Sequence, residues 1–456
     1  MNSSVFQQLA KENIETTYHS YCKHHDCSDT WLKKQREKAL EQFLIKGIPI
    51  KRDEDYKYTS LEQHLAGKYR YMPYSTGEKL NLNEIFKCDV PSLDTHLIVL
   101  VNGWFYPTVS QERLVKTNDG VVFGSLNEAF VSYSELIKQH FNRTGIEGVE
   151  KLDLINLSLM QDGLFVHVPK GSSLSKPIQV INLVVAEEPV QVYPRHLVIS
   201  ESSKLTRILF CDHSLNASPF IMNGTIEIYL AKESRLEFYR MQNAHNHSIQ
   251  LTNNYIFQEE ESHFKSLYVT LHGGMVRNNM QVNLNGKQAK TQLYGLWLAD
   301  KNQHIDYNTV VNHNAAECES NQFFKGILDD EAMGIFSGKI FVAKGSQKTN
   351  AYQSNKNLII SNGAKVRSKP HLEIYADDVK CSHGSATGKL NDDAMFYLRS
   401  RGISHKESCQ LLMFAFASDI TNQISIEPLK EEIETLVEKR LRGELSRCNR
   451  CSISCS

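Results

Sequence analysis

The sequence has no excess of charge of either sign, since 51 basic and 52 acidic residues leave a formal net charge of -1. Such a chain produces no field that would gather nucleic acid or an acidic membrane. Long apolar runs are also missing, and the longest, such as residues 411–417, are far too short to cross a bilayer. Residues 1–15 lack the basic-then-apolar order of a secretory signal. We therefore expect a soluble, cytoplasmic protein that binds neither nucleic acid nor membrane.

Catalytic and nucleotide-binding motifs are lacking as well. Residues 345–349 come nearest to a phosphate-binding loop, but Gln347 stands where the second glycine of that loop is required. No Gly-x-Ser-x-Gly elbow, His-Glu-x-x-His helix or dinucleotide fingerprint occurs. The sequence thus predicts a chain that does not hold ATP in this way and that is not an enzyme by itself.

The ten cysteines form no regular framework, and without an export signal they are expected to be thiols. Residues 22–27 combine cysteine, histidine and aspartate at the end of a helix, where such ligands are exposed and unselective. The tail, residues 446–456, carries a C-x2-C-x3-C pattern with no second C-x-x-C to complete a zinc site. An unstructured thiol tail is favoured over a metal site there. Its cysteines are Cys448, Cys451 and Cys455.

Helical patterns occur at both ends of the chain. Apolar residues at helical spacing from Trp31 to Leu44, followed by Gly47 and Pro49, predict a helix that stops there. Ser404 begins a capping-box pattern, and the apolar stretch 411–417 behind it predicts a helix buried on more than one side. Another helix is predicted from about residue 428, and its apolar face serves for packing or for docking a partner: Leu429, Ile433, Leu436, Val437 and Leu441.

The middle of the chain, from about residue 97 to 374, consists of short β-branched and aromatic runs typical of strands, such as 96–101, 178–185 and 224–230. Helical periodicity is nearly absent there, apart from 126–141. Small polar turns recur at intervals of 27 to 31 residues: Ser203, Ser234, Ser262, Ala289, Glu317 and Ser346. Near-regular spacing suggests the stacked coils of a β-solenoid, and a β-sandwich is an equally good reading of the same pattern.

Residues 369–388 are the richest segment in functional side chains. Alternation through Leu372 and Ile374 predicts an extended strand, so that Cys381 and His383, two residues apart, project from one face. Thiolate and imidazole are the ligand pair of iron in clusters, copper and zinc, yet two ligands cannot close a site. Ordinary packing in a strand is the commoner explanation of this spacing. Asp377 and Asp378 are adjacent, which suits a turn or an interface better than paired carboxylate catalysis.

The sequence closely resembles the SufD family at these residues. The strongest match is 369–384, KPHLEIYADDVKCSHG, and weaker agreement covers most of the chain, at 47–49, 54–59, 304–309, 320–322, 336–339 and 396–403. The resemblance implies a right-handed parallel β-helix flanked by helical ends. The expected regions are an N-terminal helical part (1–92), a β-helix core (93–390) and a C-terminal helical part (391–445).

The resemblance also implies a role: a non-catalytic scaffold for iron–sulfur cluster assembly, driven by a SufC-like ATPase. A SufB-like subunit would pair with the end of the β-helix, or a homodimer would form in its absence. His383 and Cys381 match the family's interface residues, with Asp377, Asp378, Lys380 and Gly384 supporting that interface. The C-terminal helices would dock the ATPase. No cofactor would be bound stably by this chain alone; iron and a nascent cluster would be held transiently in the complex, which could also carry reduced flavin.

Three alternatives remain at this stage. The first is a SufB-type paralogue, disfavoured because His383 is followed by Gly384 and not by a glutamate. The second is a β-helical carbohydrate-active enzyme using Glu373, Asp377 and Asp378, and the third is a metal-storage protein. The chain also departs from the family in two places: Tyr56 stands where tryptophan is frequent, and the cysteine tail is unusual.

Overall fold

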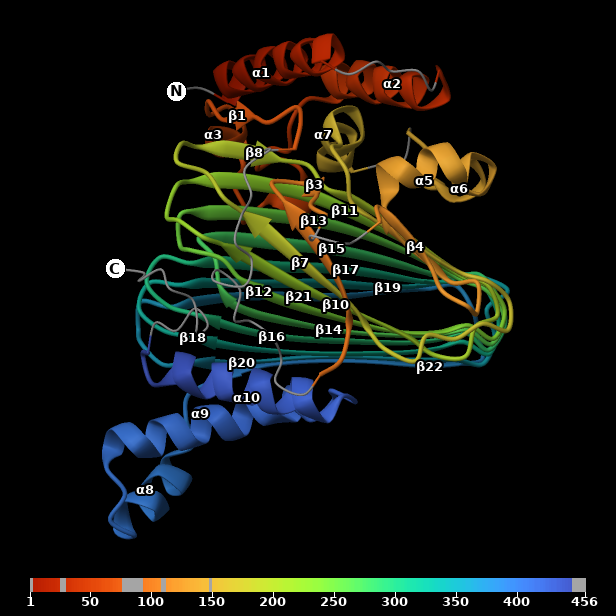
Figure 1. Cartoon of the computed structure of the whole chain (residues 1–456). Coiled ribbons are helices and arrows are strands. Elements are labelled where there is room, and N and C mark those ends of the chain that lie inside the picture. Colours follow the sequence, from red (N-terminus) through yellow and green to blue (C-terminus); the bar gives the residue numbers. More distant parts are fainter. Residues whose placement is uncertain (1–2, 25–29, 76–92, 108–111, 147–149, 445–456) are drawn as a thin grey trace.

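The computed structural model describes residues 3–24, 30–75, 93–107, 112–146 and 150–444. The tail cysteines Cys448, Cys451 and Cys455 lie outside the described residues, as does the second half of the 22–27 segment. Two long sheets face each other, and the chain alternates between them (Figure 1). This arrangement is a β-solenoid and not a β-sandwich, because from β9 onward consecutive strands lie in opposite sheets and each pairs in parallel with the strand two further along.

The first sheet of the described chain has 12 strands, with β1 (Arg70–Tyr71) and β8 (Val190–Val192) beside a main run. That run is, in order, β4 (Leu114–Lys116), β5 (Val122–Ser125), β6 (Leu164–Val168), β9 (Arg195–Ser200), β11 (Phe220–Leu230), β13 (Ser248–Gln258), β15 (Met275–Leu284), β17 (His304–His313), β19 (Met333–Val342) and β21 (Lys365–Ile374). The β4–β5 and β5–β6 pairs are antiparallel, and the strands from β6 onward pair in parallel.

The second sheet has 10 strands in the described chain. In order they are β3 (Trp104–Phe105), β2 (His96–Val101), β7 (Ile178–Val184), β10 (Thr206–Ser214), β12 (Arg235–Asn243), β14 (His263–His272), β16 (Lys290–Ala299), β18 (Glu319–Leu328), β20 (Thr349–Ile359) and β22 (Val379–Gly388). The strands predicted at 96–101, 178–185 and 224–230 are β2, β7 and the second half of β11.

The corners that connect the sheets lie where the polar turns predict them. At one corner after another, a residue adopts the left-handed conformation and turns the chain: Ser202, Glu233, Glu261, Gln288, Glu317 and Lys348. A small buried residue fills the inside of most of these corners, as Ser234 does by donating its hydroxyl hydrogen to the carbonyl of Ser200 at 2.9 Å. The recurring turn chemistry therefore sets the length of each coil.

Alternate residues of each strand fill the interior with apolar and aromatic side chains. Trp297 stacks on Tyr307 with ring centroids 5.2 Å apart, and Phe324 packs against Phe336 at 4.8 Å. All four are buried. Because every coil packs only on its neighbours, the core is a column that continues through the whole solenoid.

Helices from the first part of the chain cover the outer face of the first sheet (Figure 1). They are α1 (Ser3–His24), α2 (Thr30–Lys46), η1 (Glu54–Tyr56), α3 (Glu62–Leu65), α5 (Leu126–Ser132), α6 (Ser134–His140) and α7 (Lys151–Leu159). The predicted helix from Trp31 is α2, and Gly47, with φ of 70°, ends it. The single helical stretch expected at 126–141 is two short helices, α5 and α6. Helix α7 corrects the prediction from the sequence, since no helix was expected at 151–159.

Helices from the last part of the chain lie on the opposite side, where α9 (His405–Thr421) and α10 (Glu427–Leu441) cover the second sheet, while α8 (Asp392–Ser400) packs on α9 and projects away from the sheet (Figure 1). The capping box of α9 forms as predicted, with Ser404 and Glu407 bonding each other's backbone amides. Lys325 of β18 anchors α9 by donating to the carbonyl of Phe416 at 2.8 Å. None of the helices in the described part of the chain is both long and apolar enough to span a membrane.

The structure bears on two expectations about these helices and corrects the first. Residues 411–417 were expected to be buried on several sides, yet only Ala417 is buried, and Leu411 is 49% exposed. The apolar face of α10 was expected to serve for packing or for docking a partner, and its side chains pack into the chain's own core against the second sheet: Leu429, Ile433, Leu436 and Val437. The exposed apolar surface of this region thus lies on α8 and the first half of α9.

Candidate functional site

The last coil of the solenoid, formed by β21 and β22, contains the segment that the sequence singles out. β21 pairs with β19, and β22 pairs with β20, each along its whole length and in parallel. Both strands are the last of their sheets in the described chain, so one edge of each has no strand beside it. An open edge presents unpaired backbone donors and acceptors, which is a template for pairing with another chain.

Cys381 and His383 lie on β22 and point to the same side, as expected. Their neighbours in register on β20 are Ala351 and Gln353, which are both buried, so this side is the interior face of the solenoid. Cys381 is half-buried and packs on that core, whereas His383 is exposed at the open end. The strand on which they lie is not the one that contains Leu372 and Ile374, because a corner at 375–378 separates β21 from β22.

The donor set at this end is incomplete. Among the described residues, no group of three or more histidine, cysteine, aspartate or glutamate side chains is close enough to hold a metal ion. Burial raises the pKa of the Cys381 thiol, which keeps it protonated at neutral pH, and only the thiolate binds a metal strongly. Two donors, one of them a protonated thiol, give a site that requires further groups to act.

The other predicted residues of this segment shape the corner and the outer face. Asp378 closes the corner with its backbone: its N–H donates to Gln347 Oε1 at 2.9 Å, and its carbonyl accepts from the Lys348 N–H at 2.6 Å. Asp377 and Lys380 are exposed. A Cβ atom added to Gly384 would meet nothing within 4 Å. The fold of this chain alone therefore does not require glycine at 384, and the space beside it is open.

The carboxylate of Glu373 is held by Lys339 and His371 and is not poised as a general acid. It pairs with Lys339 at 2.9 Å and with His371 at 3.2 Å. The hydrogen bond from Lys339 is the main cause that lowers the pKa of Glu373. A glycosidase needs one carboxyl group with a raised pKa, so this arrangement does not favour a carbohydrate-active enzyme.

The charged connector at 52–59 is ordered and links the N-terminal helices to the last coil. Thr59 donates a hydrogen bond to Asp306, and the ring of Tyr56 lies 4.0 Å from the guanidinium of Arg277. Farther along, Glu54 forms an ion pair with Lys369 of β21. Tyr56, the residue that departs from the family pattern, is thus a buried packing residue.

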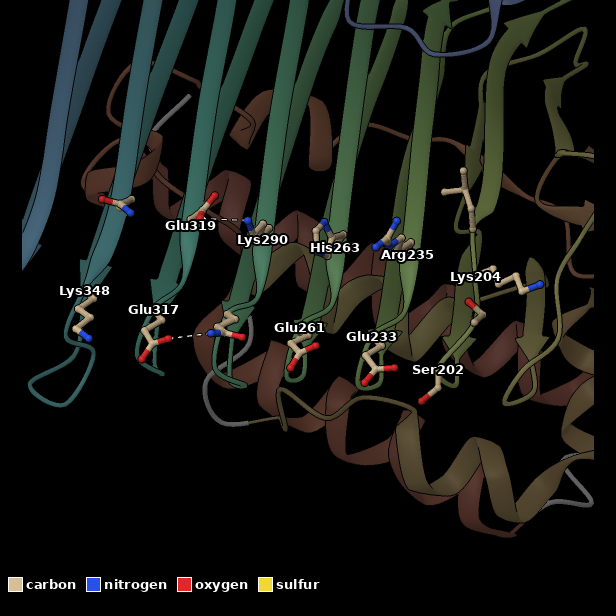
Figure 2. Close-up of a pocket in the computed structure, with 14 residues that line it drawn as sticks. Ser202, Lys204, Glu233, Arg235, Glu261, His263, Lys290, Glu317, Glu319 and Lys348 are labelled. Atoms are coloured by element: carbon tan, nitrogen blue, oxygen red, sulfur yellow. Dashed lines mark hydrogen bonds and ion pairs between the residues drawn. The ribbon is translucent and has the colours of Figure 1, made fainter.

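A polar hollow of about 1040 Å³ runs along the solenoid corner that bears the left-handed residues (Figure 2). Figure 2 shows Glu233, Glu261 and Glu317 at three of these corners, with Arg235 and Lys290 on the strands behind them. Lys290 pairs with Glu319 at 3.2 Å, so part of the charge is already balanced. The sequence analysis missed this row as a functional candidate. The only sequence feature that could have indicated this row is the spacing of the turns. The geometry of its side chains points to no particular reaction or ligand.

Comparison with known proteins gives the family. Residues 183–416 match the model described as SUF system FeS cluster assembly, SufBD core domain, and residues 12–180 match the SufBD protein N-terminal region. The chain is 29% identical over 418 residues to the iron–sulfur cluster assembly protein SufD of Escherichia coli, covering 90% of this chain and 93% of that protein. It is 29% identical to an iron–sulfur cluster assembly SufBD family protein of Synechocystis (90% and 92% covered). SufD of Bacillus subtilis is 23% identical (90% and 94% covered). Because the core match spans more than half of the sequence, the chain belongs to the SufBD family of the SUF system for iron–sulfur cluster assembly.

Proposed function

We propose that the chain is a SufD-type scaffold subunit of an iron–sulfur cluster assembly complex, acting in the cytoplasm and without catalytic activity of its own. Two relatives that match nearly its whole length carry the name SufD. His383 is followed by glycine and not by the glutamate of the SufB pattern. A SufB-type role remains the competing assignment, and the identity of the partner distinguishes the two.

The open last coil is the observation that carries this proposal. β21 and β22 leave two strand edges without a neighbour and expose Ile374 and Tyr375 beside them. Strand edges and apolar groups left in water favour association with another chain. A SufB-like subunit would pair there, and a second copy of this chain would take its place when that partner is missing.

Cys381 and His383 would contribute donors to iron or a nascent cluster, which is the cargo of the complex. The partner subunit would supply the remaining ligands, since this chain does not assemble a third one among its described residues. Asp377, Asp378, Lys380 and Gly384 would support the joined surface around them. We assign no residue of this chain to a flavin, and the tail thiols Cys448, Cys451 and Cys455, which lie outside the described residues, remain accessory candidates.

The ATPase would dock on α8 and the first half of α9. Phe396 and Tyr397 of α8 are 75% and 58% exposed, and Leu411 of α9 is exposed nearby. A hollow of about 560 Å³ between α9 and α10 adjoins Leu411 and Phe414. An apolar face of this kind is typical of a protein contact. ATP-driven movement of the docked subunits would then act on the last coil through the solenoid.

Co-expression with SufB-like and SufC-like partners tests the assembly. We expect a stoichiometric complex, measured by native mass spectrometry, that contains iron and sulfide after reconstitution, while the isolated chain shows no turnover. Purification with neither partner would refute the scaffold role. Formation of a complex with a SufD-type chain in place of a SufB-type chain would show that this chain is the SufB-type subunit.

Replacement of His383 by alanine tests the site. We expect H383A to fold and assemble normally but to lose most of the cluster yield, because an imidazole donor is removed from an already incomplete set. His371→Ala is a matched control, since His371 is an exposed histidine of the same coil that pairs with Glu373. Equal cluster yields from H383A and H371A would remove His383 from the mechanism.

A further inference from the structure

We propose that Gln353 is a positioning residue whose amide oxygen accepts a hydrogen bond from His383 when the exposed ring of that residue turns toward it, and that this bond fixes the tautomer and orientation of the ring. The proposal rests on the function proposed above, since it concerns how that site is prepared. It is drawn from the register of the last three coils and from an unpaired buried amide.

Gln353 lies directly beneath His383. The two residues are partners in register between β20 and β22, so their side chains stack on the interior face, one coil apart. Gln353 is only 3% exposed, and within the described chain neither Oε1 nor Nε2 of its amide has a hydrogen-bond partner. A buried amide without partners is costly, so a nearby group that completes it is expected.

The preceding coil shows what Gln353 lacks. Gln322 occupies the same column one coil earlier, and there Thr309, across the interior, donates its hydroxyl hydrogen to Gln322 Oε1 at 2.7 Å. The residue in register with Thr309 in the next coil is Gly338, which has no side chain to donate. The lateral bond that Gln322 Oε1 accepts is thus absent for Gln353.

Gly338 also restricts where the amide of Gln353 can go. A Cβ atom at 338 would lie 2.1 Å from Gln353 Nε2, so the amide nitrogen occupies the space that a side chain would fill. Because Nε2 lies over Gly338 and no hydroxyl faces Oε1 across the interior, Oε1 is free to accept a hydrogen bond from the next coil. In that coil the residue of the same column is His383.

The chemistry of a metal-binding histidine gives this contact a purpose. A neutral imidazole binds a metal through one ring nitrogen, and an acceptor on the other N–H fixes the tautomer and the direction of the ring. Gln353 Oε1 would be that acceptor, which directs the second nitrogen out of the open end. A ring held in this way is ready for the cargo before the partner completes the site.

Nitrogen NMR of the histidine rings in the isolated, full-length chain tests the proposal, with H383A used to identify the His383 signal. We expect a single tautomer of His383 in the wild-type protein and a mixture of tautomers in Gln353→Leu. Gln353→Glu, which keeps an acceptor, should retain the single tautomer. In the reconstituted complex, Q353L should lower the cluster yield about tenfold, as loss of an outer hydrogen bond to a metal ligand does.

Gln322→Leu is the matched control, because it makes the same change one coil deeper, away from His383. Unchanged His383 signals in Q353L, or equal changes in Q322L and Q353L, would overturn the proposal. The NMR measurement needs no partner, so it separates the two levels of inference. If H383A proves harmless in the complex while Q353L still changes the tautomer, the role proposed for His383 in cluster assembly fails and the contact stands.

Discussion

At the scale of single residues, the most deeply buried charges form an ionic network that joins α7 to the solenoid. Arg195 is fully buried and donates to Asp153 of α7 at 2.9 Å and to Glu227 of β11 at 2.7 Å. Asn142 adds an N–H bond to Glu227 at 2.6 Å. Burial raises the pKa of Glu227, so this carboxylate depends on Arg195 to remain charged.

Replacement of Arg195 by methionine should destabilise the protein by about 3–5 kcal/mol at pH 7, because two buried carboxylates lose their counter-ion. The deficit should shrink as the pH falls, since protonation removes the uncompensated charge. Urea unfolding at pH 7 and pH 5 measures both effects. Arg235→Met, at an exposed site on β12, should change the stability by about 0.5 kcal/mol or less. A similar loss in the two variants would contradict this account.

The residues of the last coil show how far sequence reasoning reaches. The two-residue spacing of Cys381 and His383 was sufficient to place them on one face of a strand, because side chains alternate in any strand. Gln353 could not be found in this way. Its importance depends on the residue that faces it across the interior, which is Gly338, whereas Thr309 faces Gln322 one coil earlier. That comparison requires the register of four strands.

At the scale of elements, the errors have a common physical cause. Turn residues and helix stops act locally, so the corners, the end of α2 at Gly47 and the capping box of α9 were predicted correctly. An amphipathic pattern, by contrast, does not say which other element its apolar face packs against. Helix α7 is buried from Leu152 to Leu159 and shows no polar face, while the apolar stretch 411–417 extends beyond the sheet that was expected to bury it.

The exposed apolar face of α8 and α9 should be essential for docking the ATPase and dispensable for folding. We expect the double variant Phe396→Glu, Leu411→Glu to keep its thermal midpoint and to lose SufC-like partner binding by at least tenfold, measured by calorimetry. Burying two carboxylates without partners would account for the loss. Val131→Glu is the control, because Val131 on α5 is 79% exposed at the other side of the molecule. Full binding by the double variant would place the contact elsewhere.

At the scale of the whole molecule, the solenoid transmits local changes along its length, because every coil is stabilised by its two neighbours. Buried neutral histidines are distributed through it. His196 lies on β9, His272 ends β14 and His313 ends β17. Burial lowers the pKa of His196 and His272 to about 3 and that of His313 to about 4, from 6.5. The folded chain therefore holds these three rings uncharged in separate coils.

This distribution predicts a loss of stability in mild acid. Below pH 6.5 these histidines bind protons in the unfolded chain but stay neutral in the folded chain. The free energy of unfolding therefore falls as the pH is lowered toward the folded-state pKa values. Each of the three histidines should contribute up to about 1.4 kcal/mol per pH unit between about pH 6 and 4. Urea unfolding at pH 7.5, 6 and 5 measures the slope, and His313→Asn should reduce it by one such contribution. A slope unchanged by H313N would show that His313 is protonated in the folded chain. Because the coils stabilise one another, charging one ring in the middle of the solenoid should also loosen the last coil, where the proposed site lies.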